Sequence, residues 1–167
     1  VLTAAHCIQS KKDSRKRKAE EAIFFLGKHN IETLNNDGYF VSSGVSQFIV
    51  HPQWDFNSDR YDADLALAVM IRSIEFSRYI LPICVWSSTK SYHDLIGKYG
   101  TIAGWGKTQH VELATSDIPK WAYVPVVDYS TCIRSRSEFR ELTSPRTFCA
   151  GRRTQDIGPC NGDSGKF

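Results

Sequence analysis

The chain has 167 residues, of which 41% are hydrophobic and 23% are charged, so it is long enough to bury a core and falls within the usual size of one domain. No run of residues approaches the about 18 apolar positions that a membrane span requires, and the first residues lack the basic region of a signal peptide. The net charge of +3 is too small to indicate a nucleic acid partner or a membrane surface. We therefore expect a soluble globular protein.

Short stretches rich in β-branched and aromatic residues predict strands along the whole chain. In chain order they cover residues 23–26, 39–41, 48–50, 65–70, 101–103 and 123–127. Turn-forming residues separate them, as in Asn35–Gly38 and Gly104–Gly106. One short helix is predicted over residues 129–136, where Asp128 can cap its start. Many short strands with few helical periods indicate an all-β fold, either an antiparallel sandwich or a barrel.

One segment, residues 11–18, is strongly basic, because only Asp13 and Ser14 interrupt its lysines and arginines. Such a run is typical of a solvated surface loop. It is also compatible with an exosite that attracts an acidic partner, because clustered charge raises association rates. The segment lies close in sequence to His6, so both interpretations stay open.

The cysteines include no Cys-x-x-Cys pair and no nearby histidine at zinc spacing, so we expect no metal site. Composition alone leaves two interpretations: buried thiols of a cytosolic protein, or disulfides of an extracellular protein. In the second case, because the number of cysteines is odd, at least one cysteine needs a disulfide partner outside this chain. The five positions are Cys7, Cys84, Cys132, Cys149 and Cys160.

Three short motifs carry candidate catalytic residues. TAAHC places His6 among small residues, DADLAL places Asp64 at the start of an apolar strand, and GDSG presents Ser164 in a turn bracketed by glycines. Each motif alone also has a structural interpretation, as a core histidine, a strand cap or an ordinary turn. The cap interpretation suits Asp62 better than Asp64. Together they supply a base, an orienting acid and a nucleophile in the order His, Asp, Ser.

Five strings, TAAHC, DADLAL, AGWGKT, FCAG and CNGDSG, follow one another over nearly the whole chain. In this order the chain resembles the chymotrypsin- and trypsin-like serine proteases. The resemblance implies an all-β fold of two Greek-key antiparallel barrels, present here as a fragment. Residues 1–80 would form most of the first barrel, 81–98 a linker, and 99–167 part of the second.

The same resemblance implies a secreted, extracellular serine endopeptidase that needs no cofactor. It would act on a protein substrate, which could be another zymogen, and would have no nucleic acid or membrane partner. The run from Gly158 to Gly165 is similar to that of modular and clip-bearing arthropod cascade proteases.

The family's mechanism assigns a role to each matching residue. His6 would act as general base and then general acid, Asp64 would fix its tautomer, and Ser164 would be the nucleophile. The backbone N–H groups of Gly162 and Ser164 would form the oxyanion hole. Asp163 would pair with the ammonium group that activation cleavage releases, and that pair would organise the oxyanion hole.

The specificity-pocket floor departs from the trypsin pattern. Gly158, followed by Pro159, stands where trypsin-like members carry an aspartate, so a substrate arginine would lack a counter-charge. An apolar or aromatic substrate residue is therefore as compatible as a basic one. Lys28 and Gly38 occupy the family's acidic calcium positions, so we expect no calcium site.

The resemblance also implies that the chain is truncated at both ends. Cys132 and Cys149 would form a disulfide, Cys7 and Cys160 would pair outside the chain, and Cys84 would tether a light chain or regulatory module. Lys166–Phe167 replaces the family's Gly-Pro. We expect the 167-residue chain by itself to be inactive, and the alternative is an inactive protease homologue that works as a binding or cofactor protein.

Overall fold

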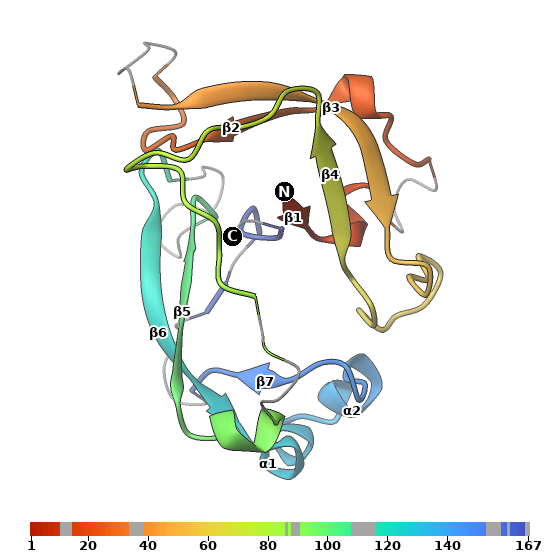
Figure 1. Cartoon of the computed structure of the whole chain (residues 1–167). Helices are drawn as coiled ribbons and strands as arrows, with labels where there is room; N and C mark the ends of the chain where they lie inside the picture. Colours follow the sequence, from red (N-terminus) through yellow and green to blue (C-terminus); the bar gives the residue numbers. More distant parts are fainter. Residues whose placement is uncertain are drawn as a thin grey trace.

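The structure is a computed structural model that describes residues 1–10, 15–33, 39–85, 87, 91–107, 116–152, 158–159 and 161–165. Two antiparallel sheets contain all the strands of these residues, and helices are few and short (Figure 1). The prediction of an all-β fold is confirmed. Predictions for residues 11–14, Gly38, Cys160 and Lys166–Phe167 concern positions outside the described residues. The proposed division at residues 81–98 stays a prediction.

The first sheet has four strands in the order β1-β4-β3-β2. Its members are β1 (Leu2–Thr3), β2 (Ile23–Leu26), β3 (Val41–Val50) and β4 (Ala66–Met70). Side chains from β3 and β4 form a small core together with the segment that follows β1. The buried members of that core are Ala5, Ile8, Val45, Phe48, Ala66 and Ala68.

The second sheet has three strands in the order β5-β6-β7. They are β5 (Tyr99–Gly104), β6 (Lys120–Val127) and β7 (Cys149–Ala150), and two helices, α1 (Tyr129–Ser135) and α2 (Glu138–Leu142), connect β6 to β7. The side chain of Asp128 accepts a hydrogen bond from the N–H of Thr131, which caps α1 as expected. A disulfide joins Cys132 in α1 to Cys149 in β7, which confirms the predicted pair.

Most predicted strands are present, but the boundaries differ. Residues 39–41 and 48–50, predicted as separate strands, belong to or flank the single ten-residue strand β3, which has a register shift between Val45 and Gln47. β5 and β6 extend beyond their predicted ranges, and α2 is not predicted. Short 3-10 helices at Ala5–Cys7, Ala19–Glu21 and Tyr92–Leu95 complete the fold. No helix of the described residues has the length and apolar character needed to cross a membrane.

The described part of the basic segment is partly neutralised by its neighbours. Arg15 forms an ion pair with Glu21 at 2.7 Å, and Lys18 lies 3.6 Å from Glu20. The N–H of Arg17 donates to the carbonyl of Ile8 at 2.8 Å, so the segment returns to the chain next to the core. The exosite interpretation stays a prediction.

Candidate active site

The pairing of β1 with β4 brings two of the three candidate catalytic residues together. Leu2 lies opposite Leu67 and Thr3 opposite Ala66, in antiparallel register. Continuing that register past Thr3 carries the chain toward residues 63 and 64. His6 follows on a 3-10 helix anchored by Ala5, which is fully buried in the core. The small residues of the TAAHC motif thus serve to hold the imidazole at the edge of the core.

His6 and Asp64 are joined by two hydrogen bonds. The backbone N–H of His6 donates to Oδ1 of Asp64 at 2.8 Å, and Nδ1 of the ring lies 2.6 Å from Oδ2. The two side chains are 29% and 16% exposed, so water competes little for either bond. Because both carboxylate oxygens are engaged, the orientation of the ring is fixed and its Nε2 faces away from Asp64.

The other side of the imidazole contacts two neighbours. The Sγ atom of Cys7 lies 3.8 Å from Nε2, and the ring of Tyr61 packs edge-on, with centroids 5.7 Å apart and an interplanar angle of 81°. The hydrogen bond to Asp64 and then the contact with Cys7 raise the pKa of His6 to about 10, while burial acts in the opposite direction. In this arrangement the imidazole carries a proton at neutral pH.

Ser164 lies close to His6 through its backbone. Its carbonyl oxygen accepts from Sγ of Cys7 at 3.6 Å, and the next residue, Gly165, accepts from the hydroxyl of Thr3 at 3.2 Å. The end of the described chain therefore lies beside β1 (Figure 1). Among the described residues, no hydrogen bond joins the hydroxyl of Ser164 to the ring of His6, whose Nε2 lies 3.8 Å from Sγ of Cys7.

The carboxylate of Asp163 binds the backbone of the Gly104–Gly106 segment. Its Oδ1 accepts from the N–H of Gly106 at 2.6 Å, and a Cβ at Gly104 or Gly106 would overlap the carboxylate. The N–H of Lys107 adds a bond to the carbonyl of Asn161 at 3.0 Å. The glycines of AGWGKT are thus explained by the close approach of the GDSG turn.

Gly162, the other proposed oxyanion-hole residue, has φ +100°, a conformation that side chains other than glycine rarely adopt. It allows the chain to turn between Asn161 and Asp163. The proposed pocket-floor residues Gly158 and Pro159 are both exposed, and no described atom lies within 4 Å of a Cβ built at Gly158.

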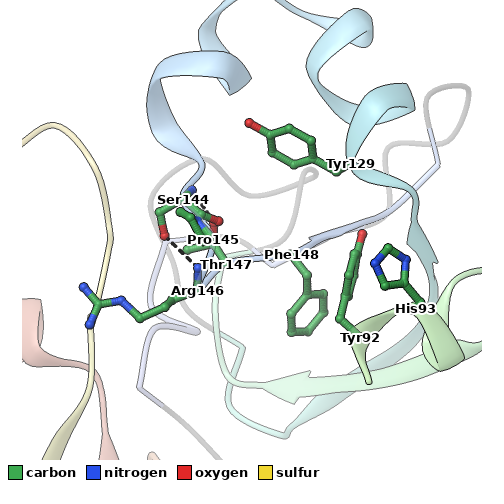
Figure 2. Close-up of a pocket in the computed structure, with 8 residues that line it drawn as sticks. All are labelled: Tyr92, His93, Tyr129, Ser144, Pro145, Arg146, Thr147 and Phe148. Carbon is green, nitrogen blue, oxygen red and sulfur yellow. Dashed lines mark hydrogen bonds between the residues drawn. The ribbon is translucent and has the colours of Figure 1, made fainter. Parts of the chain in front are cut away.

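A separate pocket of about 590 Å³ opens beside the second sheet (Figure 2), and neither His6 nor Asp64 lines it. Aromatic rings and the turn before β7 line it. The lining residues are Tyr92, His93, Tyr129, Ser144, Pro145, Arg146, Thr147 and Phe148. The guanidinium of Arg146 points out of this pocket, toward the neighbouring segment of the first half of the chain.

That segment contains Asp62, which the sequence suggests only as a cap or turn residue. Its carboxylate binds Arg146 through both oxygens and also accepts from the hydroxyl of Ser144 at 2.7 Å. Arg146 and then Ser144 lower the pKa of Asp62 to about 2. Arg146 lies 84 residues further along the chain, and no local pattern signals the pair.

The described residues contain no cluster of three or more histidine, cysteine, aspartate or glutamate side chains that could hold a metal ion. Their constellation at His6 and Asp64 instead suits proton transfer to and from a nearby hydroxyl.

The chain is similar in sequence to known proteins over nearly its whole length. Residues 1–166 match the family described as Trypsin. Serine protease gd of Drosophila melanogaster is 29% identical over 93% of this chain and 32% of its own length. Coagulation factor IX of Cavia porcellus is 30% identical over 99% of this chain and 53% of its own length. Human mannan-binding lectin serine protease 1 is 27% identical over 99% of this chain and 23% of its own length.

The chain thus spans about half the length of one of these relatives and a third or less of the other two. The family match extends from β1 to the GDSG turn, and so includes the His6–Asp64 pair and the segment that carries Ser164. The chain belongs to the trypsin family of serine proteases.

Proposed function

We propose that the chain carries the catalytic residues of a serine endopeptidase, with Ser164 as nucleophile, His6 as general base and Asp64 as the residue that orients it. The observation that supports this most is the doubly hydrogen-bonded pair of His6 and Asp64, next to which Cys7 contacts the backbone of Ser164. A serine hydroxyl is a weak nucleophile until such a base accepts its proton.

In the proposed reaction, Oγ of Ser164 attacks the scissile carbonyl while Nε2 of His6 accepts the hydroxyl proton. Asp64 stabilises the imidazolium, which then protonates the leaving amine. The N–H groups of Gly162 and Ser164 would stabilise the oxyanion, each by about 3 kcal/mol of barrier. Water then attacks the acyl-enzyme with His6 again acting as base, which releases the acid product and restores Ser164.

This reaction requires a different arrangement around Nε2. A protonated imidazole cannot accept a proton, and Nε2 contacts Sγ of Cys7 rather than the hydroxyl of Ser164. The carboxylate of Asp163 is engaged with the N–H of Gly106. We propose that activation of a zymogen moves Asp163 onto a new ammonium group and reorganises the turn that carries Ser164. The chain in the present arrangement should therefore be inactive.

Labelling with a fluorophosphonate tests the proposal, because the reagent reacts with activated serines. The complete protein should label after activation, and Ser164→Ala and His6→Ala should abolish labelling. A Ser137→Ala variant, which changes an exposed serine beside α2, should label like the wild type. The isolated 167-residue chain should label slowly or not at all. Absence of labelling in the activated complete protein would reject the enzyme.

A second candidate function is that of an inactive homologue that binds other proteins. It is favoured by the contact of Nε2 with Cys7 and the absence, among the described residues, of a hydrogen bond from Ser164 to His6. The same labelling experiment separates the two candidates. A homologue would stay unlabelled after activation and would hydrolyse neither peptide nor ester substrates.

For substrate specificity, we propose that the activated enzyme accepts an apolar or aromatic residue before the scissile bond at least as well as a basic one. The support is that Gly158 and Pro159 supply no carboxylate at the expected pocket floor. Competing peptide anilides with phenylalanine, leucine or arginine at that position measure the preference. A strong preference for arginine would show that another acid completes the pocket.

We propose that the protein works outside the cell, as a zymogen in a proteolytic cascade on a protein substrate. The Cys132–Cys149 disulfide favours an oxidising compartment, and one relative is named as a coagulation factor. The thiol of Cys84 is exposed, as a covalent link to a light chain or regulatory module would require. Electrophoresis of the secreted protein with and without reductant tests this link, which Cys84→Ser should abolish.

A further inference from the structure

Asp62 and Asp64 lie two residues apart in the chain, but their side chains bind residues of different halves of the molecule. Asp64 binds His6 in the first half of the chain, whereas Asp62 binds the turn before β7 in the second half. The guanidinium of Arg146 donates from Nε to Oδ1 of Asp62 at 2.9 Å and from Nη2 to Oδ2. This fork geometry fixes both the distance and the angle between the two groups.

The turn that presents Arg146 is itself held by several hydrogen bonds. The N–H of Ser144 donates to Oγ1 of Thr147 at 2.8 Å, and the N–H of Thr147 donates to the carbonyl of Ser144 at 3.1 Å. The hydroxyl of Ser144 also accepts from the N–H of Arg146 at 3.1 Å. Ser144 is only 8% exposed, and β7 follows the turn with its disulfide. Arg146 therefore projects from a rigid base.

The loop on the other side is equally constrained. Ala63, between the two aspartates, is buried and has φ +55°, which an alanine adopts only when its surroundings require it. The N–H of Leu65 donates to the carbonyl of Ala63 at 2.7 Å and closes a tight turn. Because this turn leaves little freedom, a shift of Asp62 must be passed on to the carboxylate of Asp64.

Two further contacts cross between the same segments. Nη1 of Arg146 also donates to Oε1 of Gln53, and Nε of Arg60 donates to the carbonyl of Glu141 at 3.1 Å. Figure 2 shows the side chain of Arg146 extended away from the pocket toward this segment. An isolated surface ion pair contributes little, but here one carboxylate receives three side-chain donors, from Arg146 and Ser144.

We infer that Asp62 and Arg146 form a positioning pair, which holds the segment of Asp64 in register with the second half of the molecule so that His6 keeps the orientation that catalysis requires. The inference rests on the proposed function, because it concerns the geometry of that catalytic pair. Asp62 and Arg146 touch neither substrate nor reacting atoms, so they act through Asp64.

Asp62→Asn in the activated complete protein tests the inference, since the amide keeps the shape of the side chain and removes its charge. We expect kcat to fall about tenfold with KM changed less than about twofold, because misorientation of a catalytic group affects the chemical step most. Asp55→Asn is the matched control. It makes the same change in the same loop, where the side chain of Asp55 accepts a hydrogen bond from the nearby N–H of Asn57, and should leave kcat unchanged.

A double-mutant cycle shows whether the two residues act as one unit. Arg146→Gln should reduce kcat about as much as Asp62→Asn, and the double variant should lose no more than either single one. An additive loss of about a hundredfold would show two independent effects and overturn the inference, as would an unchanged kcat in Asp62→Asn. Arg146→Lys keeps the charge without the fork and should give an intermediate kcat, which provides a test if another variant does not fold.

A second readout does not depend on activity. In a Ser164→Ala background, the pKa of His6 measured by NMR should fall when Asp62 is changed to Asn, because the bond to Asp64 is weakened, and should stay the same in Asp55→Asn. If the wild-type protein neither labels nor hydrolyses substrates, the proposed function fails, but this measurement still tests the positioning pair. An unchanged pKa of His6 in Asp62→Asn would overturn it.

Discussion

The two ring nitrogens of His6 have different chemical neighbours, and this difference controls what the residue can do. Nδ1 faces a carboxylate at 2.6 Å, which favours the charged imidazolium. Nε2 faces the thiol of Cys7 at 3.8 Å, which also raises the pKa of His6. In the proposed mechanism the contact with Asp64 orients the base, and the contact with Cys7 has to give way to the hydroxyl of Ser164.

We predict that both neighbours contribute to the pKa of His6, in a fixed order. Asp64→Asn should lower it most, because the hydrogen bond to Asp64 is the largest cause of the raised value, and Cys7→Ala should lower it less. An NMR titration of the imidazole Cε1–H in the three proteins measures both shifts. A larger effect of Cys7→Ala, or no effect of Asp64→Asn, would contradict the structure.

The same pair makes stability depend on pH. The pKa of His6 is raised in the folded protein, to about 10, from an ordinary value of 6.5. The pair should therefore stabilise the fold fully below pH 6.5 and lose this contribution as the pH rises toward 10. We predict that Asp64→Asn flattens the decline of the free energy of unfolding in this window, as urea titrations at successive pH values can measure. An equally steep decline in the variant would contradict the assignment.

At the scale of single residues, the sequence could predict pairs whose members lie in known motifs. It could not predict pairs whose members are far apart in the chain and lie in no motif. The pairing of His6 with Asp64 follows from the register of β1 and β4, and TAAHC and DADLAL each overlap one of those strands. Arg146 lies in none of these motifs. Its partner Asp62 could be seen as a polar residue that needs a hydrogen bond, but the donor is 84 residues away. Only the folded chain identifies it.

At the scale of single elements, apolar stretches predict where the strands lie, whereas polar residues within a strand make its predicted length too short. β2 has its predicted bounds, whereas β3 runs through serines that suggest a break. The hydroxyl of Ser46 donates to the carbonyl of Val69 in the neighbouring strand at 3.1 Å, and that of Ser43, which is buried, donates to the carbonyl of Gly44. Because these hydroxyls find partners in the sheet, they do not interrupt it.

The Cys132–Cys149 disulfide should be the main covalent stabiliser of the α1, α2 and β7 region. It closes a loop with a sequence separation of 17, and a loop of this length corresponds to about 3 kcal/mol of chain entropy. We predict that the double variant Cys132→Ala/Cys149→Ala lowers the free energy of unfolding by about this amount, as measured by urea titration. Cys84→Ala, which removes an exposed thiol, should have no effect. Equal losses in both variants would contradict the prediction.

At the scale of the whole molecule, the exposed surface is unusually large. It amounts to 12483 Å², whereas a compact monomer of 18.9 kDa has about 8,300 Å². Part of the excess is apolar and continuous. Leu65, just before β4, and Leu67 and Val69 within it are 42–48% exposed, and Ile49 of β3 lies opposite Leu67 and is 46% exposed. Such a face normally lies against other protein.

We predict that the 167-residue chain by itself associates through this β4 face. Leu67→Lys should shift the chain toward the monomer and reduce binding of the dye ANS, because it places a charge in the centre of the apolar surface. Thr101→Lys is the matched control, since it adds the same charge at an exposed position of β5, in the other sheet, without removing apolar surface. Size-exclusion chromatography with light scattering measures the oligomeric state. If Thr101→Lys dissociates the chain equally well, net charge and not the apolar face controls association.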